Sequence, residues 1–177
     1  MYSNNAHQKR FKKTLEFLNQ HIEPESSILD LGVQNPLSQM MQNQGHRVVN
    51  TQGEDLDENQ SQLRNSKAQV VTAFEILEHL LSPYQVLKSI QSKKLFVSVP
   101  LKLWFSGAYR NKTDIRDQHF HEFEDWQLDW LLEKTGWKII ASEKWINPPQ
   151  SFGIRSVLRY FVPRHYIVYA EKSNHKL

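Results

Sequence analysis

Residues 26–52 read SSILDLGVQNPLSQMMQNQGHRVVNTQ. The apolar run ILDL lies between polar residues, which predicts a short buried strand. Asn35 is a good N-cap and Pro36 suits the first position of a helix, whereas Gly45 is typical of a helix end. HRVVNTQ then predicts a second strand. A buried strand followed at once by a helix and another strand favours an α/β fold with parallel strands.

The alternation of strand and helix continues to the end of the chain. The further predicted elements are a strand in AQVVTAFEI (68–76), a helix headed by Ser82 and Pro83, a strand in KKLFVSVP (93–100), a helix over 124–134 and strands in WKIIASEKW (137–145) and HYIVYAEK (165–172). Phe123, Trp126, Trp130 and Leu131 lie on one face of the helix over 124–134. Residues 146–164 predict a connection with one short helix. We therefore expect a three-layer α/β fold, in which helices cover both faces of a mainly parallel sheet. The last strand is expected to be antiparallel.

Length and composition indicate one globular domain over residues 1–177, with an N-terminal helix inside 1–24. Lys and Arg total 22 against 19 Asp and Glu, a net charge of +3, and 39% of the residues are hydrophobic, which excludes a disordered chain. The pI of 9.0 allows an anionic partner such as nucleic acid but does not require one. The absence of cysteine excludes disulfides, thiolate metal sites and a thiol nucleophile.

The start of the chain does not have the pattern of a secretion signal. MYSNNAHQKRFKK leads into TLEFLNQ, where an apolar core would have to follow the positive charges. No window approaches 18 consecutive apolar residues. We therefore expect a cytoplasmic protein without stable membrane insertion.

Three stretches together resemble the class I S-adenosylmethionine-dependent methyltransferases. Asp30-Leu31-Gly32, placed between a strand and a helix, resembles their first motif. VVTAFEILEHLLSPYQVLKSI (70–90) resembles their fourth-strand motif, and KKLFVSVP with HFHEFEDWQLDWLLEKTGWKII (119–140) resembles the units that follow. The resemblance spans about residues 26 to 145. It implies a Rossmann-like methyltransferase fold, S-adenosylmethionine as the cofactor and methyl transfer as the reaction.

The same resemblance implies a cofactor site at the carboxyl ends of the strands, where open parallel sheets bind ligands. The implied cofactor-binding residues are Asp30, Gly32, Val33, Gln34, Gln52, Asp55, Phe74 and Glu75. Gln34 and Pro36 stand where the family usually has two further glycines. A glycine-poor loop is also typical of a fold that has lost its cofactor, so a non-catalytic binding or scaffold protein is one alternative.

The segment between the second and third predicted strands is short. Residues 53–67 leave too little chain for the helix, strand and helix that this superfamily normally has there. The third strand of the family is therefore predicted to be missing, which leaves six strands.

Glu75, Glu78 and His79 are spaced i, i+3 and i+4, which on one helical turn places them on the same face. In ubiquinone-type O-methyltransferases and small-RNA 2′-O-methyltransferases, a similar Glu-x-x-Glu-His holds a divalent ion, in the RNA enzymes with a further His. The resemblance thus implies a Mg²⁺ or Mn²⁺ site of Glu75, Glu78, His79 and His119. Without a metal, His79, His119 and His121 are the candidate catalytic bases.

Residues 101–123 form an aromatic and basic connection in the place where this superfamily builds its substrate wall. Trp104, Phe105 and Tyr109 either stack on a substrate ring or belong to the core. We expect methyl transfer to an oxygen or nitrogen of a small metabolite. Metal-assisted 2′-O-methylation of RNA is the second candidate, less favoured because the chain contains no separate RNA-binding module.

Overall fold

The computed structural model describes residues 5–114, 117–146 and 158–173. The helices are α1 (Asn5–Asn19), α2 (Pro36–Asn43), α3 (Ser61–Asn65), the 3₁₀ helix η1 (Leu77–His79), α4 (Pro83–Ser89) and α5 (Asp125–Lys134). The strands are β1 (Ser27–Asp30), β2 (Arg47–Asn50), β3 (Val70–Phe74), β4 (Lys94–Pro100), β5 (Trp137–Trp145) and β6 (His165–Lys172). Every predicted strand is present. The short helix expected within 146–164 falls largely outside the described residues.

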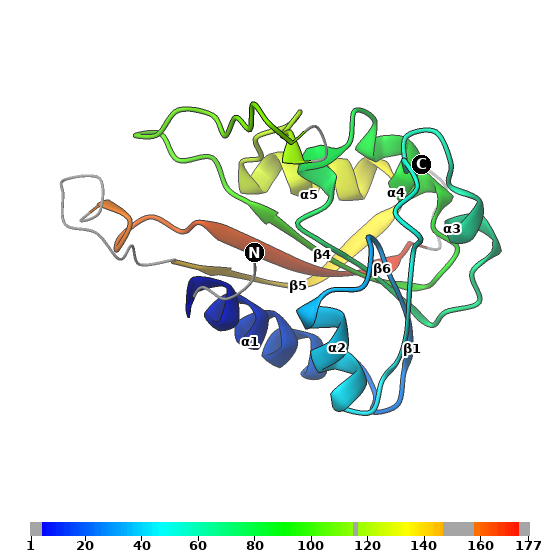
Figure 1. Cartoon of the computed structure of the whole chain (residues 1–177). Helices are drawn as coiled ribbons and strands as arrows, with labels where there is room; N and C mark the ends of the chain where they lie inside the picture. The colour runs from blue at the N-terminus through cyan, green and yellow to red at the C-terminus, as the bar shows by residue number, and fades with distance from the viewer. Residues whose placement is uncertain (1–4, 115–116, 147–157, 174–177) are drawn as a thin grey trace.

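The strands form one sheet in the order β2-β1-β3-β4-β6-β5. β1 pairs in parallel with β2 and β3, and β3 pairs in parallel with β4. β6 lies antiparallel between β4 and β5, so β5 forms the edge of the sheet. The predicted mainly parallel sheet with an antiparallel last strand is confirmed (Figure 1).

The missing strand is also confirmed. Residues 53–67 are all described, and they contain turns and the short helix α3 but no strand. β2 is consequently the other edge of the sheet, which has six strands within the described residues.

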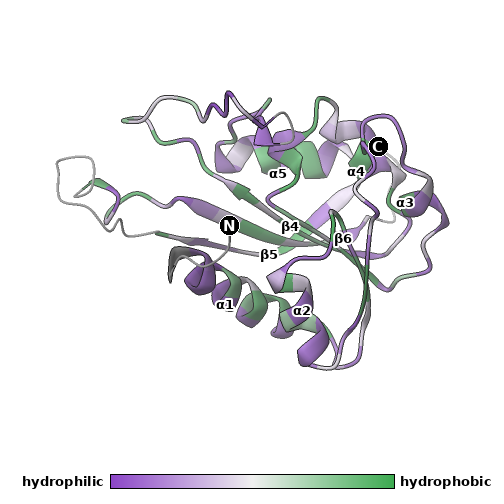
Figure 2. Cartoon of the chain, in the orientation of Figure 1, coloured by the Kyte–Doolittle hydropathy of each residue, from purple (hydrophilic) through white to green (hydrophobic). Residues whose placement is uncertain are grey.

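Helices cover both faces of the sheet. Figure 1 shows α1 and α2 below the strands and α3, α4 and α5 above them. One buried cluster joins Leu18 of α1 and Met41 of α2 to the strands, and a second joins Leu87 of α4 and Leu128 of α5 to the opposite face. In Figure 2 the hydrophobic colour accordingly concentrates on the strands between the two helical layers. Because β1, β3 and β4 are buried on both sides, they read as continuous apolar runs.

The face of α5 that carries Trp126 and Trp130 is not the buried face of this helix. Trp126 and Trp130 do lie together, with ring centroids 4.9 Å apart, but they are 44% and 65% exposed. Leu128 and Leu132, one turn apart on the neighbouring face, are fully buried instead. The tryptophans are therefore surface residues and not part of the core.

The carboxyl ends of the four parallel strands meet at one edge of the sheet. We call this edge the carboxyl rim; it contains Asp30, Asn50, Phe74 and Pro100 and the residues that follow each of them. His165 at the start of β6 pairs with Pro100 and so lies on the same rim. Among the described residues, no helix has the length and apolar composition needed to cross a bilayer.

Candidate active site

Asp30, a buried residue at the end of β1, accepts hydrogen bonds from the two neighbouring strands. Its Oδ1 accepts a 2.6 Å hydrogen bond from Thr72 Oγ1, and its Oδ2 accepts a 2.9 Å bond from Asn50 Nδ2. Burial raises the pKa of Asp30 to about 6, and these two hydrogen bonds oppose the rise. Asp30 thus ties the ends of β1, β2 and β3 together below the loop that follows β1.

Gly32 begins this loop in a conformation that favours glycine, with φ of +98°. Its N–H donates to Thr51 Oγ1 at 2.7 Å, and its carbonyl accepts from Asn50 Nδ2 at 3.2 Å. A Cβ added to Gly32 would lie 3.3 Å from Ile76 Cδ1. The side chains of Val33 and Gln34 extend into solvent. Gly32 is therefore the one position of this loop whose backbone conformation requires glycine.

The helix after the loop begins as predicted. Asn35 Oδ1 accepts from the N–H groups of Leu37 and Ser38, while Ser38 Oγ accepts from the N–H of Asn35. This reciprocal capping fixes the start of α2 beside Gly32.

Gln52 and Asp55 follow β2, as expected, and both are exposed. The N–H of Gln52 donates to Glu54 Oε2 at 2.7 Å, and Asp55 Oδ1 accepts from the N–H of Asp57 at 2.9 Å. The Asp57 carboxylate in turn accepts from the N–H groups that precede α4. The acidic turn therefore makes structural hydrogen bonds on the carboxyl rim, and the cofactor roles of Gln52 and Asp55 stay predictions.

Glu75 does not share a helical face with Glu78 and His79. It directly follows Phe74, the last residue of β3, with φ of +55°, an unfavourable conformation for a residue other than glycine. This turn redirects the backbone after β3, before the 3₁₀ helix η1 begins at Leu77. The expectation of one helical turn carrying all three groups was wrong.

Three elements hold the Glu75 carboxylate. Arg10 of α1 donates to Oε2 at 2.9 Å, Ser98 of β4 donates to Oε1 at 3.0 Å, and His165 Nδ1 lies 3.5 Å from Oε2. Burial alone would raise the pKa of Glu75, but Arg10, His165 and Ser98 hold that pKa at about 2. Sequence reasoning missed these three partners, because no local pattern links residues so far apart in the chain.

Glu78, His79 and His119 do converge. One ligand atom from each of the three side chains lies within 4.8 Å of the others. His79 and His119 pack edge to face, with ring centroids 4.7 Å apart, and Glu78 Oε1 lies 3.9 Å from His79 Nε2. Glu78 is 1% exposed, and its Oε2 makes no hydrogen bond to the residues that the structure describes. The side chain of Phe74, another predicted site residue, is half-buried and packs against the hydrophobic cluster between the sheet and helices α1 and α2.

The backbone around Gln118 orients His79. His79 Nδ1 lies 3.0 Å from the Gln118 carbonyl oxygen, which can only accept, so Nδ1 carries the hydrogen. Nε2 is then the basic nitrogen, and it faces Glu78. Burial and the neighbouring Glu75 raise the pKa of Glu78 well above its usual value, while burial and His79 lower the pKa of His119.

His121 lies outside this group of three. Its Nε2 is 3.4 Å from the carbonyl oxygen of Leu81, and its ring packs near Phe123. The N–H groups of Phe120 and His121 both donate to the Glu78 carbonyl, so the main chain of 118–121 is fastened to η1. The structure thus brings together three of the predicted side chains, and it places Glu75 and His121 separately.

Trp104, Phe105 and Tyr109 of the 101–123 connection are not core residues. Trp104 is 75% exposed and Tyr109 is 42% exposed, while Phe105 is half-buried and packs edge to face with Trp104. The Tyr109 ring lies 4.4 Å from the His119 ring, and its hydroxyl donates to Asp117. Tyr109 therefore borders the group formed by Glu78, His79 and His119.

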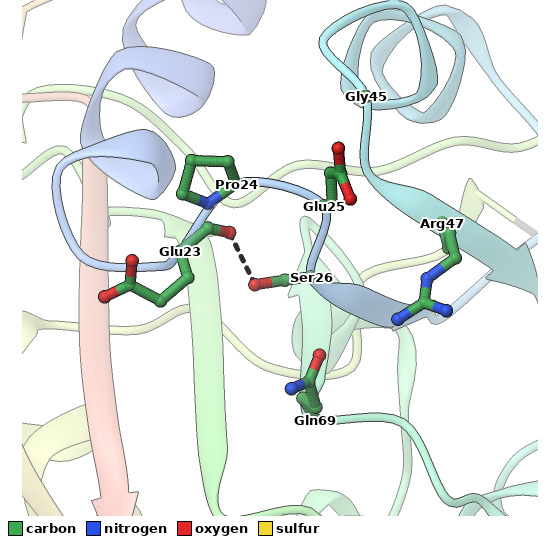
Figure 3. Close-up of a pocket in the computed structure, with 7 residues that line it drawn as sticks. All are labelled: Glu23, Pro24, Glu25, Ser26, Gly45, Arg47 and Gln69. Atoms are coloured by element: carbon green, nitrogen blue, oxygen red, sulfur yellow. Dashed lines mark hydrogen bonds between the residues drawn. The ribbon is translucent and has the colours of Figure 1, made fainter.

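Two surface hollows lie at the opposite edge of the sheet. The first, of about 420 Å³, is lined by Glu23, Pro24, Glu25, Ser26, Gly45, Arg47 and Gln69, as Figure 3 shows. The second, of about 380 Å³, is lined by residues around Ser66–Val70 and Gln91–Lys94. Both open at the amino ends of the strands, whereas open parallel sheets bind ligands at the carboxyl ends. We therefore place the candidate active site on the carboxyl rim.

The fold is shared with solved methyltransferase structures. A SAM-dependent methyltransferase from Archaeoglobus fulgidus has a TM-score of 0.64 and 12% identity, covering 97% of this chain and 96% of that one. An S-adenosylmethionine-dependent methyltransferase from Mesorhizobium loti has a TM-score of 0.62 and 10% identity, covering 97% and 100%. A putative methyltransferase of Haloferax volcanii, in complex with the Trm112 methyltransferase activator, has a TM-score of 0.62 and 11% identity, covering 96% and 92%.

No curated protein matches the sequence. Residues 4–142, however, match the family described as methyltransferase domain, and these residues include the whole group of Glu78, His79 and His119. This match favours the enzyme over the scaffold alternative. The chain therefore belongs to the methyltransferase-domain family and is a class I S-adenosylmethionine-dependent methyltransferase.

Proposed function

We propose that this methyltransferase acts on an oxygen or nitrogen of a small metabolite and that His79 takes the proton that the acceptor loses. The observation that carries the proposal is the orientation of His79. The Gln118 carbonyl fixes the hydrogen on Nδ1, so Nε2 presents its lone pair next to Glu78 and His119. An imidazole whose Nδ1–H is held by a carbonyl offers Nε2 as the proton acceptor that general base catalysis requires.

The reaction needs little from the protein beyond alignment and proton removal. The methyl group of the sulfonium moves to the acceptor atom with loss of the acceptor's proton, and S-adenosylhomocysteine is the second product. Nε2 of His79 receives this proton, and Glu78 beside it stabilises the resulting imidazolium. Gly32 and the end of β1 are proposed to bind the cofactor, together with Val33, Gln34, Gln52, Asp55, Phe74 and Glu75.

A divalent ion is a second proposal for the same three side chains. One carboxylate and two imidazoles suit Mn²⁺ better than Mg²⁺, which prefers oxygen ligands, and the buried Glu78 oxygen without a hydrogen bond is available as a ligand. Glu75 is not included, because its carboxylate is bound by Arg10 and Ser98. When bound, such an ion would lower the pKa of an acceptor hydroxyl. This arrangement supports the second candidate function, 2′-O-methylation of RNA.

The test measures formation of S-adenosylhomocysteine from S-adenosylmethionine in the presence of phenols, hydroxy acids, amines or short RNA oligonucleotides. We expect turnover with a small acceptor, a loss of about 100-fold or more in His79→Gln and little change in His121→Gln. Turnover with RNA alone would favour the second candidate. Equal turnover by wild type and His79→Gln would exclude His79 as the base.

A further inference from the structure

Two segments of the carboxyl rim carry aromatic side chains into solvent. Trp104, Tyr109 and Phe120 belong to the connection after β4, and Tyr160 and Phe161 belong to the turn before β6. Trp104 is 75% exposed and Phe161 is 77% exposed, whereas large apolar side chains on a soluble surface are usually scattered and partly covered. We call these five residues the aromatic rim.

The two segments leave the sheet side by side. The N–H of Leu101 donates to the Arg164 carbonyl at 2.8 Å, and Arg164 Nη1 donates to the Leu101 carbonyl at 2.6 Å. The His119 and Tyr109 rings, 4.4 Å apart, hold the later part of the connection against its middle. In Figure 1 the green connection after β4 and the orange turn before β6 both extend past the end of the sheet on the same side. The two segments of the aromatic rim therefore leave the sheet at the same end.

Three cations on this surface lack an ion-pair partner among the described residues. Arg110, Lys112 and Arg159 are exposed, and within the described part of the chain they form no ion pair or hydrogen bond. Two carboxylates of the same connection accept hydrogen bonds from neutral groups instead of these cations. Glu122 accepts from the N–H of Tyr109, and Asp117 accepts from the Tyr109 hydroxyl and from Asn111. Unpaired cations therefore lie next to exposed aromatic rings in both segments.

This combination favours a lipid surface over a protein partner. The buried core of a protein interface is closely packed and depleted in charged residues. Here the aromatic side chains lie on projecting segments, and Arg110 and Arg159 lie directly beside Tyr109 and Tyr160 in the sequence. Aromatic rings that enter the headgroup region, with Lys and Arg next to them, are the usual elements of peripheral binding to anionic bilayers.

We propose that the aromatic rim docks on the surface of bilayers that contain anionic phospholipid. Trp104 and Phe161 enter the interface, and Arg110, Lys112 and Arg159 contact phosphate groups. Because Tyr109 also borders the group of Glu78, His79 and His119, docking brings the candidate active site to the membrane surface. Only this last consequence rests on the proposed function; the docking itself does not.

The experiment is co-flotation of the full chain with vesicles of phosphatidylcholine alone or of phosphatidylcholine with phosphatidylglycerol. We expect binding to the mixed vesicles, weakened by salt. The double variant Trp104→Ser/Phe161→Ser should lose about tenfold or more in affinity. Arg110→Glu/Arg159→Glu should lose binding to the mixed vesicles specifically. Tyr84→Ser, which removes an exposed aromatic side chain of α4 that does not belong to the aromatic rim, is the matched control and should bind like wild type.

Calorimetric binding of S-adenosylhomocysteine by each variant shows whether it is folded, and it separates a failure of docking from a failure of the proposed function. Absence of wild-type binding to either vesicle would overturn the proposal. Equal binding by wild type and the double variant would do the same. Light scattering after gel filtration provides the last arm: a dimer that disappears in the double variant would identify the aromatic rim as a contact between two copies and contradict the lipid assignment.

Discussion

Arg10 in the first helix and Glu75 at the end of β3 form an ion pair with an N–O distance of 2.9 Å, across 65 positions of the chain. The pair connects the N-terminal helix to the carboxyl rim beside the candidate active site. Its two side chains are 20% and 16% exposed, so solvent screens their interaction only in part. Glu75 also has a positive φ, and such strained residues persist only where the surroundings fix them.

Arg10→Met should lower the free energy of unfolding by about 2–3 kcal/mol at pH 7, because it leaves a mostly buried carboxylate without its cation. Urea unfolding measures this change. Lys13→Met in the same helix is the control: its 4.0 Å pair with Glu143 is about half exposed, so this substitution should cost less than about 1 kcal/mol. Equal losses in the two variants would contradict a special role for Arg10.

The same pair predicts acid sensitivity. The folded pKa of Glu75, about 2, is below its unfolded value of about 4.3, so the stability that this group contributes is present above the unfolded pKa. It is lost as the pH falls from about 4.5 towards 2. We expect Arg10→Met to lose less stability than wild type over this interval in thermal unfolding. Parallel pH curves would show that Arg10 does not set the Glu75 pKa.

Asp30 predicts the opposite dependence at a higher pH. Its folded pKa, about 6, is above the unfolded value of about 3.9, so ionisation of this group favours the unfolded chain. Stability from Asp30 is therefore largest below pH 4 and decreases as the pH rises from about 4 to 6. Asp30→Asn should remove this part of the pH dependence between about pH 4 and 6, as followed by urea unfolding. A variant that keeps the wild-type slope would assign the dependence to another group.

The proposed metal site predicts a thermal shift with Mn²⁺. The melting temperature of wild type should rise by about 2–4 °C for each kcal/mol of added stability, which grows with the ratio of the Mn²⁺ concentration to Kd, and a chelator should reverse the rise. Glu78→Gln and His119→Ala should not respond, since each removes one of the three ligands. His121→Ala should respond like wild type, because His121 lies outside the group. If all the variants shift alike, Mn²⁺ binds elsewhere.

The order of elements could be predicted from the sequence because it depends on local signals. Asn35 and Pro36 mark the start of α2, and both positions have the expected roles. The length of residues 53–67 was enough to predict that a strand is missing, since a chain segment has a fixed maximum reach. Apolar runs covered on both sides identified the central strands.

The candidate site could be predicted only in part. Regular spacing suggested one helical turn for Glu75, Glu78 and His79, but the backbone reverses at Glu75, where Arg10 and His165 hold its carboxylate. Such contacts depend on the order of strands in the sheet, which spacing along the chain does not reveal. The sequence also did not reveal which face of α5 is buried. Leu128 and Leu132 pack into the core, whereas the two tryptophans of this helix lie on the surface.

Gly32 and Gly45 offer a matched comparison for the cofactor site. Both have a positive φ, of +98° and +95°, so a β-branched residue strains the backbone equally at either position. Only Gly32 lies on the carboxyl rim; Gly45 follows α2 at the opposite edge of the sheet. Gly32→Val should abolish cofactor binding, whereas Gly45→Val, where an added Cβ has no atom within 4 Å, should keep it.

Calorimetric titration of the wild-type chain with S-adenosylhomocysteine tests the central claim most directly. The account predicts saturable heat of binding at one site per chain, retained in Gly45→Val and absent in folded Gly32→Val. An absence of heat with the folded wild-type protein, or equal binding by Gly32→Val, would contradict a cofactor site at the end of the first strand.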